Sequence, residues 1–240
     1  MTGLTPKIIY EDKDVVVLNK PAGLLVHPIK AHPNPKKTLV DWLVKKYPSI
    51  KKVGDEPENR PGIVHRLDQG TSGVMVAAKT QKAFEFLKRQ FQSRQTRKVY
   101  TTLVWGTFTM RSGIIEKPIG IKTGTLKRTV KITDDTKLVK DAKTIYRVVE
   151  ELGPYSLVEV EPLTGRTHQI RVHLAFLHHP VVGDRLYSQR DVPEGMKRMF
   201  LHAVSLELML PNQKRQKFTA ELPQELRSTL SELRDPSAKR

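Results

Sequence analysis

The chain has 240 residues, of which 38% are hydrophobic and none is cysteine. This length suits one good-sized core or two modest subdomains, and the lack of cysteine excludes disulfides, thiolate metal sites and cysteine nucleophiles. The formal net charge of +17 favours a polyanionic partner, with nucleic acid first among the candidates.

The chain carries no pattern typical of membrane insertion or export. Its longest apolar runs, such as residues 15–18 and 74–78, are far shorter than the about 20 residues that cross a bilayer. Residues 1–7 lack the basic start and apolar stretch of a secretory signal. We therefore expect a soluble chain with no membrane partner and a cytoplasmic location.

The first part of the chain reads as short strands interspersed with helices. Thr38 is a helix N-cap, and Pro48 ends the helix that follows it. Apolar spacing in residues 81–93 indicates an amphipathic helix with a basic outer face. The pattern further predicts strands at residues 7–10, 15–19 and 74–79 and a charged loop at 51–62.

The second part of the chain is richer in strands. Residues 106–141 look irregular, with short strands and an exposed basic loop. Residues 167–178 read as a helix in which Arg171 shares a face with Thr167 and Ala175. We also expect strands at 98–105, 200–210 and 218–222, a hairpin of 142–150 with 155–161, a helix at 223–234 and a disordered tail at 235–240.

Strands and helices without a strict βαβ rhythm predict an α+β fold with a mixed, largely antiparallel sheet flanked by helices and loops. No domain linker stands out. The positive charge is uneven, because residues 81–98 hold six basic residues against one acid and residues 111–147 hold ten against four. A solvated surface explains any one such cluster, but several together favour nucleic acid.

Two stretches point to chemistry rather than packing, residues 65–73 (His-Arg-Leu-Asp-Gln-Gly-Thr-Ser-Gly) and 165–173 (Gly-Arg-Thr-His-Gln-Ile-Arg-Val-His). An aspartate placed as Asp68 is can act as a nucleophile or base if a cation keeps it ionised and an apolar wall excludes water. Arg171 is the candidate cation. Taken singly, Asp68 could instead cap a turn, and Arg171 could lie on a helix surface.

These stretches resemble the signature motifs of the RluA family of RNA pseudouridine synthases. Four more stretches resemble motifs of that family: residues 19–28 (Asn-Lys-Pro-Ala-Gly-Leu-Leu-Val-His-Pro), Lys98-Val99-Tyr100 with Gly106 after it, residues 183–187 and residues 201–203. The resemblance covers roughly residues 10 to 211. Six ordered motifs make a chance match improbable.

The resemblance implies an isomerase that converts uridines of tRNA, large-subunit rRNA or both to pseudouridine. It implies one catalytic domain over residues 1–240 with a central cleft: an N-terminal extension at 1–10, a core of two halves at 11–222, and a helix and tail at 223–240. We expect no S4-type RNA-binding domain, since little chain precedes the first motif. No metal or organic cofactor, no obligate protein partner and a monomeric state are also expected.

The resemblance also assigns roles. Asp68 would act at the ribose of a flipped-out uridine, either by attacking C1′ or by taking a proton from C2′; Arg171 would pair with Asp68, and Tyr100 would stack on the uracil and assist C5 deprotonation. The remaining predicted substrate-binding residues are Lys98 as support, Leu67 and Ile170 as apolar walls, Arg66 as the group that fills the vacated space in the RNA, and His65 and Arg166.

Other interpretations remain open at this point. Tyr100 could be a packed strand tyrosine, and His65 and His202 could be structural histidines. The histidines at 168, 173, 178 and 179 suggest a metal, but no His-Glu-x-x-His pattern occurs. An RNA-binding protein without catalysis would lack Asp68, Tyr100 or Arg171, and a metal-dependent nuclease would need clustered carboxylates.

Overall fold

The computed structural model describes residues 4–28, 37–125 and 127–235, and it divides into two compact units. The first unit contains the chain up to Lys98 together with Ala203–Glu221, and the second contains Val99–His202 together with the chain from Leu222 onward. Among the described residues, the longest helix has 12 residues, and no helix combines the length and apolar character that a membrane span requires. The expected tail after Asp235 lies outside the described residues.

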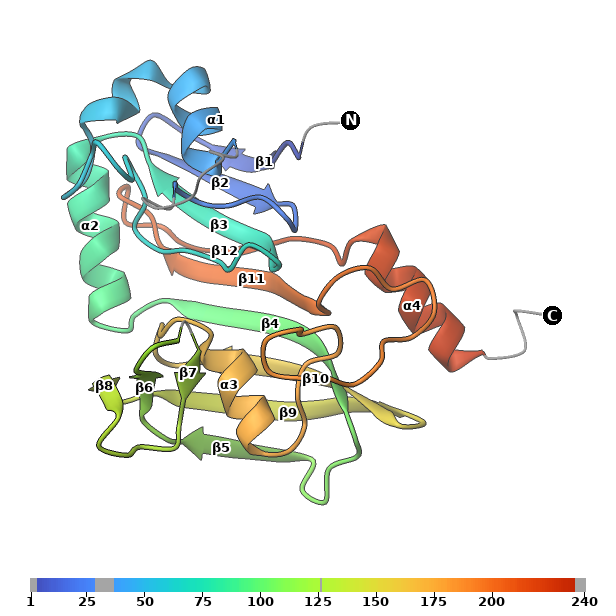
Figure 1. Ribbon diagram of the computed structural model, residues 1–240. Helices are drawn as coiled ribbons and strands as arrows, with labels where there is room; N and C mark the ends of the chain where they lie inside the picture. The colour runs from blue at the N-terminus through green and yellow to red at the C-terminus, as the bar shows by residue number, and fades with distance from the viewer. Residues whose placement is uncertain (1–3, 29–36, 126, 236–240) are drawn as a thin grey trace. The chain divides into compact units, whose positions relative to one another are not determined.

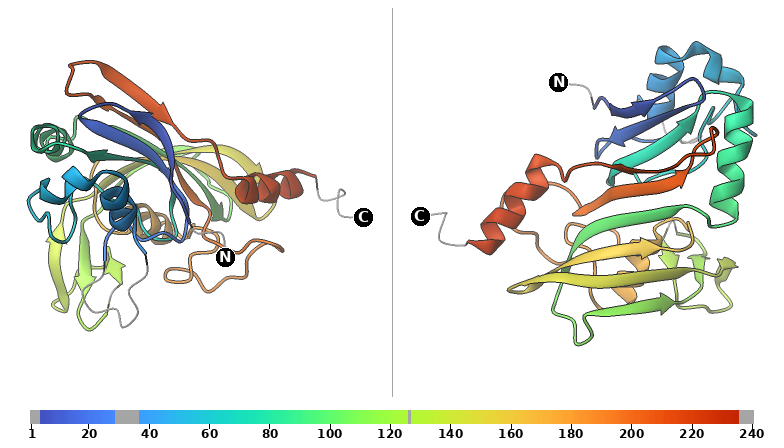
Figure 2. Two further views of the ribbon diagram at one scale, coloured as in Figure 1. Left: turned by 90° about the horizontal axis from the view of Figure 1, so that it is seen from above. Right: turned by 180° about the vertical axis from the view of Figure 1, so that it is seen from behind.

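The first unit is built on a sheet whose strand order is β1-β2-β3-β11, with β12 beside β11 (Figure 1). Three helical segments accompany the strands, and α2 packs against β3 and lies beside the strands in both views of Figure 2. The elements are β1 (Lys7–Glu11), β2 (Val15–Lys20), α1 (Leu39–Lys46), the 3₁₀ helix η1 (Pro48–Lys52), β3 (Ser72–Ala78), α2 (Gln81–Gln92), β11 (Leu201–Met209) and β12 (Arg215–Thr219).

The central strands of this unit are buried on both faces. Val15–Leu18 of β2 are fully buried, and every residue of β3 is buried. Such strands read as continuous apolar runs rather than as alternating patterns. The sequence prediction of buried strands at these places is therefore confirmed, as is Thr38 as the N-cap of α1, where the Thr38 Oγ1 accepts the Asp41 N–H at 3.2 Å.

His65 joins β3 to α2. Its Nε2 accepts the backbone N–H of Val76 at 3.0 Å, and its ring stacks on Phe91 with centroids 4.5 Å apart. Burial, assisted by the charge of Lys98, lowers the pKa of the imidazole to about 3. His65 is therefore neutral near pH 7 and serves as a structural link within this unit.

The second unit has an antiparallel sheet in the order β4-β10-β9-β5 and a smaller sheet in the order β7-β6-β8 (Figure 1). Helix α3 covers one face of the larger sheet: it lies in front of β9 and β10 in Figure 1 and behind them in the reverse view of Figure 2. The elements are β4 (Arg97–Trp105), β5 (Ser112–Glu116), β6 (Ile119–Lys122), β7 (Arg128–Thr129), β8 (Thr136–Lys140), β9 (Lys143–Leu152), β10 (Tyr155–Pro162), α3 (Gln169–Phe176) and α4 (Gln224–Arg234).

Alternation along β4 and β10 produces two separate cores. Val104 and Val158 face a cluster that includes Leu174 of α3, whereas their neighbours Leu103 and Leu157 face a cluster that includes residues of α4. Successive side chains of a strand point to opposite faces, so one pair of strands supports a helix on each side. This arrangement agrees with the predicted α+β fold and its largely antiparallel sheet.

Two sequence predictions differ from the structure. Helix α3 begins at Gln169 because His168 adopts a left-handed conformation (φ 57°), so Thr167 does not share a helical face with Arg171. Strand β12 covers Arg215–Thr219 rather than 218–222, since its pairing with β11 is set by register, and Leu222 packs near α4 instead. The region 106–141 contains the short strands β5 to β8, which agrees with the short strands predicted there.

The glycine that opens β3 provides a test of this packing. Gly73 has φ +118°, and a Cβ there would overlap the backbone of Ala203. We expect Gly73→Ala to lower the free energy of unfolding by about 3 kcal/mol or more, measured by urea denaturation. Gly54→Ala is the matched control, because Gly54 has a similar φ of +123° but only ordinary contacts around it, the nearest at 3.5 Å. An equal loss in the two variants would contradict the proposed overlap.

The depressed pKa of His65 predicts a pH dependence of stability. Below about pH 6.5 the unfolded chain takes up a proton at this residue, whereas the folded chain stays neutral until about pH 3. The free energy of unfolding should therefore fall as pH drops from 6.5 toward 4, with a contribution of up to about 1.4 kcal/mol per pH unit from His65. His65→Gln, which retains a neutral acceptor for the Val76 N–H, should give a shallower slope; identical slopes would refute the assignment.

Candidate functional site

Asp68 lies in the loop that leads into β3. The N–H of Thr71 donates to the main-chain carbonyl of Asp68 at 3.1 Å, which makes a tight turn, and Asp68 itself is half-buried. Leu67 beside it is buried at 4% exposure, as expected for an apolar wall, and Arg66 on its other side is exposed. The carboxylate thus stands between an apolar and a solvent-facing neighbour.

A fully buried lysine holds this loop in place. Lys20 is 0% exposed, and its Nζ donates to the carbonyls of Pro21 at 3.0 Å, Leu24 at 2.9 Å and Gln69 at 3.4 Å. Gly23 and Gln69 add two hydrogen bonds, of 2.7 and 3.0 Å. A buried ammonium is tolerated only when its protons are satisfied, so these carbonyls are fixed around it. Residues 20–24 therefore position the residue that directly follows Asp68.

Arg66 contacts the same N-terminal motif. Its Nη1 donates to Nε2 of His27 at 2.7 Å, which leaves Nδ1 of His27 to donate to the carbonyl of Pro28 at 3.1 Å. Burial, with the charge of Arg66 as a smaller cause, lowers the pKa of His27, partly offset by the bond to Pro28. Arg66 is held beside Asp68 at the surface of the first unit.

In the second unit, Tyr100 and Ile170 contact one apolar cluster. Tyr100 pairs with Val160 across β4 and β10, and its half-buried ring packs against the cluster that contains Ile170, which is 6% exposed. Lys98, two residues before Tyr100, is half-buried. The structure thus brings the predicted stacking residue and one predicted apolar wall together.

Arg171 makes a bidentate ion pair with Asp184. Its Nε donates to Oδ2 at 2.6 Å and its Nη2 to Oδ1 at 2.8 Å, with side chains 11% and 1% exposed. Asp184 also accepts the N–H groups of Leu186 and Tyr187, and the guanidinium lies 5.1 Å from the centroid of the Tyr187 ring. Arg171 is therefore fixed in place by a residue to which the sequence analysis assigned no role.

The predicted pairing of Arg171 with Asp68 stays a prediction. A guanidinium has N–H groups beyond the two that bind Asp184, so the observed pair is chemically compatible with a second carboxylate. The substrate-binding roles of His65 and Lys98 likewise stay predictions. One clue to Asp184 existed in the sequence, because it lies in the motif at 183–187 that resembles the family.

Two of the four histidines considered as metal ligands, His168 and His173, have other partners. His173 bonds to the Thr144 hydroxyl at 2.8 Å and to the Lys117 carbonyl at 3.0 Å, and His168 bonds to the Tyr187 hydroxyl at 2.9 Å. Within the ranges that the structure describes, no three His, Asp or Glu side chains gather as a possible metal site. These histidines tie α3 and its N-terminus to neighbouring segments.

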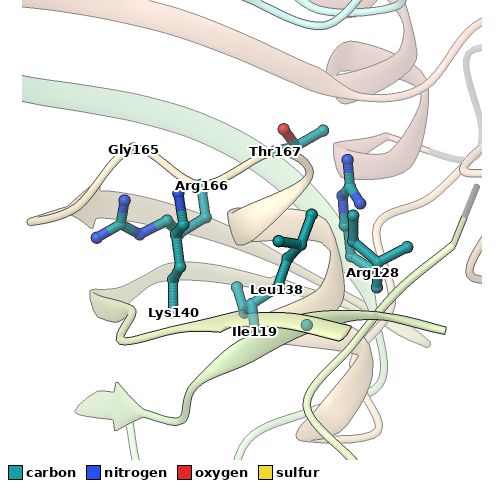
Figure 3. Close-up of a pocket in the computed structure, with 9 residues that line it drawn as sticks. Ile119, Arg128, Leu138, Lys140, Gly165, Arg166 and Thr167 are labelled. Atoms are coloured by element: carbon teal, nitrogen blue, oxygen red, sulfur yellow. The ribbon is translucent and has the colours of Figure 1, made fainter. Parts of the chain in front are cut away.

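Arg166 lines a cavity of about 250 Å³ in the second unit (Figure 3). The cavity is bordered by the small sheet and by the loop before α3, and Arg128 and Lys140 join Arg166 around it. The Arg166 Nε donates to the carbonyl of Asp141 at 3.0 Å. The predicted substrate-binding arginine thus belongs to a second basic location in this unit.

Comparisons with known proteins agree with the motifs. A family model described as RNA pseudouridylate synthase matches residues 14–176. An uncharacterized RNA pseudouridine synthase of Chloroflexus aurantiacus is 44% identical over 90% of this chain and 66% of its own length. The ribosomal large subunit pseudouridine synthase D of Borreliella burgdorferi is 40% identical over 90% of this chain and 65% of its own length.

A solved structure gives the same answer for the fold. The human RNA pseudouridylate synthase domain containing 4 protein superposes with a TM-score of 0.73 and 27% identity, covering 95% of this chain and 93% of that one. The chain spans just under two thirds of the length of the two bacterial relatives. With the family match over more than half of its residues, the chain belongs to the RNA pseudouridylate synthase family, of the RluA type.

Proposed function

We propose that this chain is an RNA pseudouridine synthase that uses Asp68 to isomerise uridine in RNA. The observation that carries the proposal is the family match over residues 14–176, which includes the Asp68 loop and its support by Lys20. The net charge of +17 suits an RNA substrate.

The reaction exchanges one bond of uracil for another. The N1–C1′ bond breaks, the base turns, a C5–C1′ bond forms, and the C5 proton leaves while N1 gains a proton. No electrons are lost or gained overall. Asp68 supplies the carboxylate that the ribose needs, either as a nucleophile at C1′ or as a base at C2′. Arg66, exposed and held by His27, fills the space that the flipped uridine leaves in the RNA.

Arg171 and Tyr100 complete the proposed catalytic set. Arg171 provides a fixed positive charge for Asp68, and Asp184 prevents the guanidinium from turning away. Tyr100 offers a ring edge or face to uracil and assists loss of the C5 proton, with Lys98 and Ile170 lining the base-binding side. His65 and Leu67 would then act on the substrate mainly by shaping the Asp68 loop.

Large-subunit ribosomal RNA is the first substrate to test, because the Borreliella burgdorferi relative is named for it. Transfer RNA is the second. A cytoplasmic monomer would reach either substrate. A binding protein without catalysis is the rival function, and the presence of Asp68, Tyr100 and Arg171 counts against it.

Replacement of Asp68 tests the proposal directly. RNA carrying tritium at uridine C5 should release label with the wild-type chain and none with Asp68→Ala, because no other group supplies the carboxylate. RNA affinity should change by less than about threefold, since phosphate contacts dominate binding. Both rRNA and tRNA from cells lacking the modification should be tried. Label release by Asp68→Ala, or none from either RNA with folded wild-type protein, would refute the proposal.

Arg171→Lys tests the geometry of the guanidinium. Lysine keeps the charge but cannot give two parallel N–H groups to Asp184, so kcat for label release should fall by about 100-fold. Arg147→Lys is the control, because Arg147 makes an exposed ion pair with Glu159 on the sheet, and its rate should stay within about twofold. Rates should be compared well below each variant's thermal midpoint. A near-normal rate for Arg171→Lys would remove this residue from the catalytic set.

A further inference from the structure

We propose that the cavity beside the small sheet binds one nucleotide of the RNA at a position other than the uridine being modified. Three cations would hold its phosphate, and an exposed leucine would pack against its base. The identity of the ligand as substrate RNA rests on the proposed function. The physical case for a nucleotide rests on the charge, shape and backbone of the cavity itself.

The charge at this cavity is uncompensated. Arg128, Lys140 and Arg166 line it, and among the described residues none of the three makes an ion pair with an aspartate or glutamate. Figure 3 shows Lys140 and Arg166 on one side and Arg128 on the other, with Leu138 and Ile119 between them. Like charges held near each other repel, so an arrangement of this kind is stabilised by an anion.

The cavity also has an apolar component with an unusual backbone. Leu138 has φ 51° and is 70% exposed, although a branched side chain in this region costs about 1 kcal/mol or more. The pairing of β6 with β8 is irregular here, between Ile119 and Ile121. Leu138 therefore presents an apolar side chain to solvent beside three cations, in a backbone conformation that costs energy.

Size and composition distinguish a nucleotide from other anions. A cavity of about 250 Å³ lies just below the range of about 300–1,000 Å³ that accommodates whole small-molecule ligands, so it suits one phosphate with part of its ribose or base. A site for inorganic phosphate alone would not need Leu138 or Ile119. Single-stranded RNA offers both components in each residue.

Contacts within the second unit connect this cavity to Arg171. The backbone N–H of Arg128 donates to the Tyr187 hydroxyl at 2.9 Å, and Nδ1 of His168 bonds to the same hydroxyl at 2.9 Å. The ring of Tyr187 in turn lies against the Arg171 guanidinium, 5.1 Å from centroid to Cζ. A nucleotide in the cavity would therefore sit next to the residues that support Arg171.

The test measures RNA binding without turnover. Fluorescein-labelled 12-residue oligouridine is titrated with the Asp68→Ala chain, by fluorescence anisotropy, over a range of KCl concentrations. The double variant Arg128→Ala, Lys140→Ala should bind at least about tenfold more weakly, and the slope of log affinity against log salt should flatten by about 1.4, for two lost phosphate contacts. Lys140→Ala alone should show about half the change in slope, which keeps the test valid should Arg128→Ala unfold the chain.

The matched control is Lys137→Ala. Lys137 is exposed on the same strand as Lys140 and carries the same charge, but it does not line the cavity. Its loss should weaken binding by less than about twofold. The loss of affinity and the change in salt slope are compared per positive charge removed. If these are equal for the double variant and for Lys137→Ala, RNA binds by nonspecific electrostatic attraction and the proposed site does not exist.

Substitution of Leu138 distinguishes a nucleotide site from a site for phosphate alone. Leu138→Ala should weaken binding of oligouridine by about fivefold while leaving an abasic ribose-phosphate 12-mer unchanged. Equal effects on the two polymers, or displacement of oligouridine by millimolar inorganic phosphate beyond its ionic-strength effect, would overturn the proposal of a nucleotide site. Tritium release is measured separately, with the chain that retains Asp68 and an unchanged cavity. If the cavity variants bind RNA more weakly as expected but this chain releases no tritium, only the proposed catalysis is refuted.

Discussion

The burial of one ammonium group constrains the candidate active-site loop. Lys20 is the last residue of β2 and is inaccessible to solvent, so its three donors must find acceptors inside the protein. One of those acceptors is the carbonyl of Gln69, directly after Asp68. An alternative loop path would leave the buried ammonium without this acceptor. The cost would be on the order of several kcal/mol, comparable to breaking a buried ion pair. The path of the backbone directly after Asp68 is thus tied to the burial of Lys20.

The second unit contains a comparable constraint. Asp184 is almost fully buried, and its two oxygens accept from the guanidinium of Arg171 and from two backbone N–H groups. A carboxylate satisfied in this way fixes both the rotamer and the plane of the arginine. In both units a buried charged group is held by polar partners inside the protein, next to a residue that the proposed function places at the substrate. This is the organisation expected when geometry rather than flexibility determines activity.

Patterns of neighbouring residues predicted most of the helices and strands. Features that depend on contacts between distant residues could not be predicted from the sequence. The run Val15–Leu18, the N-cap Thr38 and the alternation in β9 and β10 are each determined by neighbouring residues, and each prediction matches the structure. The predicted start of α3 was wrong because His168 adopts a left-handed conformation and bonds to Tyr187, 19 residues away, and neither feature is encoded in the local apolar pattern. The position of β12 depends on its register with β11, which no local pattern encodes.

The same distinction applies to the site. Motifs predicted roles for Asp68, Tyr100 and Arg171. A motif does not show which groups each of these side chains contacts. Lys20 and Asp184 were missed as individual residues because a lysine or aspartate at a strand end or turn is usually exposed, and only the fold shows that these two are buried. Their sequence signals are visible in retrospect, since Lys20 follows a continuous apolar strand and Asp184 follows the turn at Gly183, where φ is +79°.

The distribution of charge explains why binding and chemistry can be assigned to different residues. Many surface cations of this chain are paired, such as Arg60 with Glu56, Lys143 with Glu116 and Arg234 with Glu150. Exposed pairs of this kind contribute little to stability, but they remove positive charge from the surface available to RNA. Arg128, Lys140 and Arg166 lack such partners among the described residues, so they remain available to phosphate. In the proposed function, unpaired cations would hold the RNA, whereas the buried pair of Arg171 with Asp184 would orient a charge at the ribose.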